Sequence, residues 1–175
     1  MAIRNMRYDG DEILRKISKP VKEITPRTAE LINDLSENLK EYNGVGLAAV
    51  QVGVLKRIAI VNVPSLDEEG NEIEGEDIVI INPEIEVVGE ETQTGYEGCL
   101  SIPGKSGAVT RPMNIVLKAY DRNLKYYELE ASGLLARAIC HECDHMDGIL
   151  YKDKVEGKLY DNEELYGDED EEADE

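Results

Sequence analysis

The only two histidines of this 175-residue chain stand four residues apart, in the word H-E-C-D-H at residues 141–145. Side chains four positions apart on a helix project from the same face, so His141 and His145 can reach one metal ion together. Glu142 would then lie beside the ion, where a carboxylate can take a proton from bound water. This spacing indicates a hydrolytic metal site, although two ordinary helix histidines would give the same pattern.

A third metal ligand is needed, because a hydrolytic site uses three protein ligands and leaves a fourth position open to water. With no third histidine, this ligand must be Cys, Asp or Glu. Cys99 is a candidate, since Gly98 lets the backbone approach an ion and Pro103-Gly104 then turns the chain away. Taken alone, Cys99 is more typical of a small buried apolar residue, so the residues by themselves leave the third ligand open.

The other two cysteines, Cys140 and Cys143, have the C-x-x-C spacing of redox and zinc sites. On a helix that carries His141, however, their side chains point away from the histidine face. We therefore expect both thiols to pack in the core. Three cysteines in an intracellular chain do not indicate a disulfide framework.

A run of small residues, G-V-G-L-A-A-V-Q at residues 44–51, follows an expected helix and ends in Gln51. Glycine-rich loops can bind phosphate, but this one lacks the Lys and Ser/Thr of a P-loop and the G-x-G-x-x-G spacing. We therefore do not expect nucleotide binding. A tight turn with close packing explains the run equally well.

The composition is acidic, with a formal net charge of −19, and residues 161–175 hold 10 of the 38 acidic residues and neither Lys nor Arg. Such charge repels phosphates, so we expect no direct nucleic-acid binding. No apolar run approaches the roughly 18 residues that span a bilayer, and residues 1–7 lack the apolar segment of a secretion signal. We expect a cytoplasmic protein with no membrane contact.

Periodicity predicts two long helices. The first covers residues 25–42, with Thr25 as its cap, and the second begins near Ser132, carries residues 141–145 and ends near Gly148. Apolar, β-branched runs predict strands, with a polar loop or hairpin at 64–77 and a stop at Asn82-Pro83; the strands are expected at 57–63, 78–81, 85–88, 115–119 and 126–129.

Because the strands occur in groups after each helix, the sequence predicts an α+β fold. Antiparallel sheets would pack around a central metal-binding helix that carries H-E-x-x-H. The length fits one domain, which we expect to cover residues 1–160 as the catalytic unit. Residues 161–175 would form an acidic, disordered tail.

Three words in this order resemble the motifs of peptide deformylases: residues 44–51 (G-V-G-L-A-A-V-Q), residues 97–101 (E-G-C-L-S) and residues 141–145. The resemblance covers about residues 2–155, including I-N-P at 81–83 and S-I-P-G at 101–104. The chain departs from the family pattern at three places. Cys140 stands where Gln is common, and Met146 stands where Leu is usual. Residues 105–107 lack an Arg that is often found there.

The resemblance implies a hydrolase that removes formyl from the N-formylmethionine of nascent peptides, with the ribosome exit region as a further partner. It implies Cys99, His141 and His145 as the metal ligands and Glu142 as the general acid and base. Two imidazoles and a thiolate suit Fe²⁺, Zn²⁺, Ni²⁺ or Co²⁺. The resemblance implies that the chain binds one divalent ion and that Fe²⁺ is the native one.

The resemblance also implies that Gln51 and the backbone N–H of Leu100 stabilise the oxyanion, and that Gly46 binds the peptide backbone. Substrate recognition would centre on an unbranched methionine side chain. We expect the walls of its pocket to include Val45, Leu134 and Ala138. We further expect the protein to act as a monomer.

Two other functions stay open. An H-E-x-x-H endopeptidase would use a downstream carboxylate, such as Glu163 or Glu164, as its third ligand, and Cys99 would then only pack. A non-enzymatic binding protein would instead engage basic partners through its acidic tail.

Overall fold

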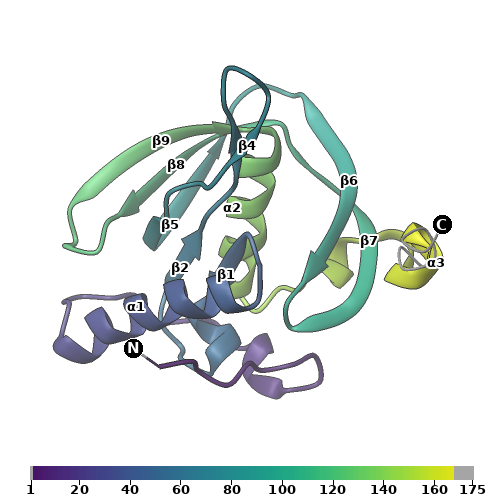
Figure 1. Cartoon of the computed structure of the whole chain (residues 1–175). Helices are drawn as coiled ribbons and strands as arrows, with labels where there is room; N and C mark the ends of the chain where they lie inside the picture. Colours follow the sequence, from purple (N-terminus) through teal and green to yellow (C-terminus); the bar gives the residue numbers. More distant parts are fainter. Residues whose placement is uncertain (1, 168–175) are drawn as a thin grey trace.

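One central helix separates two antiparallel sheets. The computed structural model describes residues 2–167, and helix α2 (Gly133–Met146) runs between a five-stranded sheet and a three-stranded sheet, as Figure 1 shows. The residues 141–145 all lie within α2. The structure therefore confirms the predicted mixed fold of helices and antiparallel sheets.

The five-stranded sheet has the order β1-β2-β5-β8-β9. Its strands are β1 (Gly46–Ala48), β2 (Ile58–Val61), β5 (Ile78–Val87), β8 (Asn114–Tyr120) and β9 (Tyr126–Ser132). All four residues of β2 are buried because the strand is covered on both faces: Ala59 and Val61 join the core under α2, while Ile58 and Ile60 join the core under α1.

Helix α1 (Pro26–Glu41) covers the second face of this sheet. Thr25 caps it by accepting a hydrogen bond from Thr28 N at 3.2 Å, and Pro26 occupies the first position, where its missing N–H costs nothing. Its buried apolar side chains are Leu31, Ile32, Leu35 and Leu39. The predicted helix over residues 25–42 is therefore confirmed.

The predicted stop at Asn82-Pro83 is wrong, because β5 continues through it as a single strand. Asn82 adopts φ 49°, and the pairing register shifts between Ile81 and Glu84. This irregularity accommodates Pro83, which has no backbone N–H to donate to a neighbouring strand. The strand pairs with β2 before it and mainly with β8 after it.

The three-stranded sheet, in the order β10-β7-β6, was not predicted from the sequence. It consists of β6 (Thr92–Cys99), β7 (Ile102–Pro112) and β10 (Glu156–Asp161). Glycines at 95, 98, 104 and 107 weaken the strand signal of β6 and β7. The two strands nevertheless pair along almost their whole length.

The polar segment 64–77 forms the predicted hairpin, with β3 (Ser65–Leu66) paired to β4 (Glu72–Ile73). Short 3₁₀ helices complete the fold: η1 (Glu12–Arg15), η2 (Ala49–Val52) and η3 (Tyr151–Lys154). No helix in the described range is long and apolar enough to cross a membrane.

The predicted tail over residues 161–175 begins within the described structure. Asp161 ends β10, and a short helix α3 (Asn162–Tyr166) follows it. Residues 168–175 lie outside the described residues. The domain boundary at residue 160 therefore stays a prediction.

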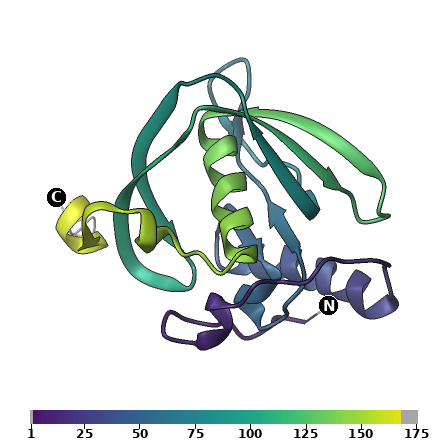
Figure 2. The same cartoon turned by 180° about the vertical axis from the view of Figure 1, so that it is seen from behind.

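The N-terminal segment passes close to the end of α2, as the rear view in Figure 2 shows. Arg7 N donates to Gln51 O on η2 at 2.7 Å, and Asp9 N donates to Ser101 O, between β6 and β7, at 2.9 Å. Ser18 N donates to the carbonyl of Met146, the last residue of α2, at 2.8 Å. The segment thus fixes three separate parts of the chain relative to one another near the end of the central helix.

Candidate metal centre

Three side chains, two from α2 and one from β6, meet on one side of α2. Cys99 ends β6, His141 and His145 lie on α2, and their candidate ligand atoms are all within 4.8 Å of one another. Cys99 Sγ is 3.4 Å from His145 Nε2. Glu163 and Glu164 lie on α3 and do not join this group, so the endopeptidase interpretation loses the third ligand that it requires.

A local irregularity in β6 places Cys99. The register with β7 shifts between Glu97 and Cys99, and Cys99 then pairs with Ile102 to close the hairpin. Such irregularities often redirect a side chain next to a functional site. A Cβ atom on the intervening Gly98 would lie 3.3 Å from Lys105 O, so the close approach of the two strands favours glycine there.

The donor set and the unpaired atoms around it fit a divalent metal ion. One sulfur and two imidazole nitrogens are common ligands of Zn²⁺ and Fe²⁺. Glu142 Oε2 and His145 Nδ1 are buried without a hydrogen-bond partner among the described residues. A buried polar atom without a partner is costly, and a water molecule on the ion would provide one for Glu142.

Glu142 is buried between α2 and β1. Burial raises the pKa of its carboxyl group to about 7, so the side chain can both accept and release a proton near neutral pH. A Cβ atom at Gly46 would lie 2.5 Å from Glu142 Oε1. Glycine at position 46 is therefore required for β1 to pass so close to this carboxylate.

Gln51 lies on η2 and is fixed at both ends of its amide. Its Oε1 accepts from Ala48 N at 2.9 Å, while Nε2 donates to Ser101 Oγ at 3.1 Å and lies 3.6 Å from Cys99 Sγ. The amide N–H group is thus directed toward the metal centre. Leu100 follows Cys99 directly and is half-buried.

A cavity of about 750 Å³ opens over this centre. Its lining contains nine of the ten predicted site residues, which are Val45, Gly46, Gln51, Cys99, Leu100, Leu134, Ala138, His141 and Glu142. The tenth, His145, is fully buried behind them. Val45 and Leu134 are exposed apolar side chains, as expected for the walls of a binding pocket.

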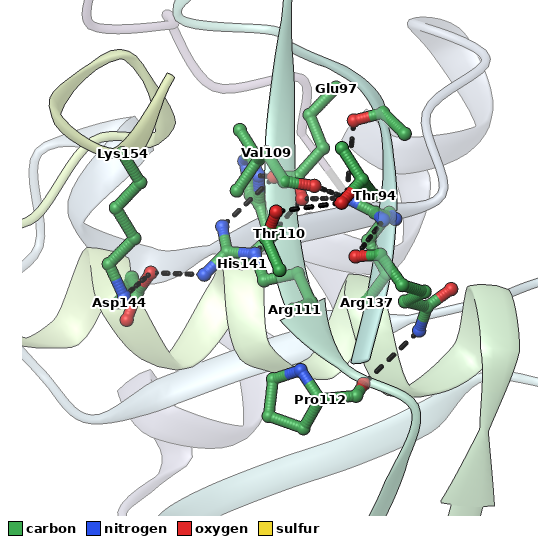
Figure 3. Close-up of polar contacts among 12 residues, drawn as sticks. Thr94, Glu97, Val109, Thr110, Arg111, Pro112, Arg137, His141, Asp144 and Lys154 are labelled. Atoms are coloured by element: carbon green, nitrogen blue, oxygen red, sulfur yellow. Dashed lines mark hydrogen bonds and ion pairs between the residues drawn. The ribbon is translucent and has the colours of Figure 1, made fainter. Parts of the chain in front are cut away.

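The sequence analysis assigned no role to Glu97, which the structure places at the centre of a buried polar network (Figure 3). Glu97 Oε1 accepts from His141 Nδ1 and from Arg111 Nη2, both at 2.9 Å. Burial alone would raise its pKa, but the hydrogen bonds from His141 and Arg111 hold the pKa of Glu97 well below its usual range. The available signal was its position in the motif at residues 97–101, two residues before Cys99.

Glu97 also defines how His141 can bind a metal ion. Because Nδ1 of His141 is engaged by the carboxylate, Nε2 is the nitrogen left for coordination. Tyr151 on η3 stacks against the same imidazole, with ring centroids 5.9 Å apart and an angle of 25° between the planes. The ring of His141 is thus fixed by a hydrogen bond and by an aromatic face.

Cys140 and Cys143 belong to the buried apolar core, as the sequence analysis expected. Burial raises the pKa of both thiols, which keeps them protonated and poorly nucleophilic.

The fold and the site together define a class of protein: an α+β domain with a metallohydrolase-type centre on its central helix. The family model of polypeptide deformylases matches residues 3–159, and the chain belongs to this family. A peptide deformylase of Lachnoclostridium phytofermentans is 54% identical over 169 residues, covering 94% of this chain and 99% of the relative.

Solved structures agree with this assignment. The peptide deformylase of Ehrlichia chaffeensis matches with a TM-score of 0.81 and 35% identity over 89% of each chain. A Met-Ala-Ser bound class I type b peptide deformylase of Acinetobacter baumannii matches with a TM-score of 0.80 and 31% identity, over 88% of this chain and 99% of the other.

We expect Cys99→Ala to weaken Zn²⁺ binding by more than about 100-fold, because losing a metal ligand should reduce the affinity more than losing a residue that only hydrogen-bonds to a ligand. Chelator competition measures the affinity. Cys143→Ala is the matched control, since it removes a buried thiol that only packs. Equal affinity in Cys99→Ala and the wild type would show that the third ligand is another residue.

Proposed function

We propose that this chain is a metal-dependent hydrolase that removes the formyl group from the N-terminal formylmethionine of newly made polypeptides and releases formate. The observation that carries the proposal is that Cys99, His141 and Glu142 line one cavity, with His145 grouped with Cys99 and His141 and buried behind the lining. Membership of the polypeptide deformylase family, over residues 3–159, identifies the reaction.

Cys99 Sγ and the Nε2 atoms of His141 and His145 would hold one divalent ion. We propose Fe²⁺ as the native ion, with Zn²⁺, Ni²⁺ and Co²⁺ as substitutes that the same donors accept. When bound, such an ion would lower the pKa of a water molecule and would polarise the formyl oxygen.

Glu142 acts as the general acid and base. Its unpaired Oε2 can receive a proton from water, and the same carboxyl group can then deliver that proton to the leaving amine. Its pKa of about 7 suits both transfers at neutral pH.

Gln51 and the backbone N–H of Leu100 stabilise the negative charge that develops on the formyl oxygen. The Gln51 amide is held by Ala48 and Ser101 before any substrate arrives, so little reorganisation is needed during the reaction. Leu100 contributes from the position directly after Cys99.

The peptide binds along β1. This strand is at the edge of the five-stranded sheet, so one side of it is available for pairing with an extended chain, and Gly46 lies there. Val45, Leu134 and Ala138 form the walls around the methionine side chain. The Acinetobacter baumannii relative was solved with a Met-Ala-Ser peptide bound, which supports a peptide in this cavity.

The substrate determines where the enzyme works. Nascent polypeptides become available at the ribosome exit region, so we propose that the enzyme acts there, in the cytoplasm. We further propose that it acts as a monomer and that residues 1–160 form its catalytic domain. The net charge of −19 disfavours direct contact with RNA. Contact with a ribosome would therefore involve basic proteins.

The first test is formate release from formyl-Met-Ala-Ser by anaerobically prepared, Fe²⁺-loaded protein. We expect release by the wild type, and a rate lower by about 10²–10⁴-fold in Glu142→Gln, because the substituted amide cannot transfer the proton. Metal content, measured in parallel, should be unchanged. No formate from fully metal-loaded wild type would reject the function, and a normal rate in Glu142→Gln would reject the base.

The second test concerns Gln51. Replacing it with Glu keeps the acceptor for Ala48 but removes the N–H donors, so we expect kcat to fall by about 10²–10³-fold with little change in KM. Steady-state kinetics on the same peptide measure both constants. A rise in KM at constant kcat would assign Gln51 to substrate binding instead of charge stabilisation.

A further inference from the structure

The Glu97 carboxylate is bonded to four donors. Besides its two bonds at Oε1, its Oε2 accepts from Arg111 Nε at 2.9 Å and from Arg137 Nη1 at 2.6 Å. Two bonds to each oxygen use the full capacity of a carboxylate. Arg111 and Arg137 are themselves buried, with 3% and 8% of their surfaces exposed.

The two arginines tie Glu97 to different elements. Arg111 belongs to β7, so its two bonds to Glu97 hold the carboxylate within the hairpin formed by β6 and β7, while its Nη1 donates to Asp144 on α2 at 2.6 Å. Arg137 belongs to α2, where it precedes His141 by four residues and therefore shares its face. The Arg137 and His141 side chains thus bind one oxygen each of the same carboxylate from the same helix (Figure 3).

Arg137 also reaches the backbone of both strands of this hairpin. Its Nη1 donates to Val109 O on β7 at 3.0 Å, and its Nη2 donates to Gln93 O on β6 at 3.2 Å. The rigid, planar guanidinium suits such multiple bonding, which an ammonium group cannot reproduce. One side chain of α2 is therefore bonded to the element that carries Cys99.

Gly95 leaves the space that this arrangement needs. A Cβ atom at Gly95 would lie 3.3 Å from Arg137 Nη2, which is a tight contact against a side chain held at several points. An alanine there would push the guanidinium away from its acceptors. The glycine on β6 and the arginine on α2 are thus a structurally coupled pair.

We propose that Arg137 is a positioning residue for the metal centre, which holds the hairpin bearing Cys99 against the helix bearing His141 and His145. This inference rests on the proposed metal ligands. Through Glu97, Arg137 also fixes the orientation of the His141 ring. Its removal leaves Glu97 bonded to Arg111 on β7 and to His141, but it removes every bond made from Arg137 to the hairpin.

The test measures Zn²⁺ affinity by chelator competition, without any assay of catalysis. We expect Arg137→Leu to weaken binding about 10–100-fold, the usual effect of losing a partner that orients a ligand. Arg137→Lys keeps one charged donor for Glu97 and should recover part of that loss. Gly95→Ala should weaken binding in the same direction and to a smaller extent.

Tyr127→Phe is the matched control for stability. It removes a part-buried hydrogen bond, from Tyr127 Oη to Val79 O at 2.7 Å, in the five-stranded sheet. We expect it to lower the Tm without changing Zn²⁺ affinity. The Nδ1–H NMR signal of His141 in the Zn²⁺-loaded protein gives a second readout, and it should shift or broaden in Arg137→Leu but not in Tyr127→Phe.

Unchanged Zn²⁺ affinity and an unchanged His141 signal in Arg137→Leu, with only the Tm lowered, would overturn the inference. If Arg137→Leu does not fold, Arg137→Lys and Gly95→Ala decide the question by the same two readouts. Failure of the wild type itself to bind Zn²⁺ would instead reject the proposed metal ligands, and the positioning role with them.

Discussion

The candidate metal centre depends on one buried carboxylate. Glu97 stays ionised in a buried environment because two guanidinium groups and an imidazole bind it, and in return it orients the ring of His141. Breaking a buried ion pair by removing one partner typically costs about 3–5 kcal/mol, since a charge is left uncompensated. The same interaction thus links the stability of the β6–β7 hairpin to the geometry of the candidate ligands on α2.

The rest of the fold brings reactive groups to that helix from several directions. The end of β6 supplies Cys99, η2 supplies Gln51, and β1 passes so close to Glu142 that only glycine fits at position 46. The N-terminal segment bonds to η2, to Ser101 and to the end of α2, and so limits their relative motion. Preorganisation of this kind favours a reaction in which charge develops at a fixed point.

Local signals in the sequence predicted the parts of the structure that local physics determines. The cap at Thr25 and the helical periodicity of apolar residues predicted both long helices. Most of the residues that meet in the cavity were instead implied by the resemblance of three motifs to those of peptide deformylases. The β6–β7 hairpin was missed because its glycines obscure the strand pattern. The arginines that bind Glu97 were missed because pairing between residues 14 and 40 positions apart leaves no periodic trace.

The most direct test of this account is the absorption spectrum of the Co²⁺-substituted protein. Coordination by Cys99, His141, His145 and one water molecule predicts intense visible bands of four-coordinate Co²⁺ together with a sulfur-to-metal charge-transfer band in the near ultraviolet. Weak, six-coordinate bands without charge transfer would contradict it, because they would mean that the thiolate and the two imidazoles do not bind one ion.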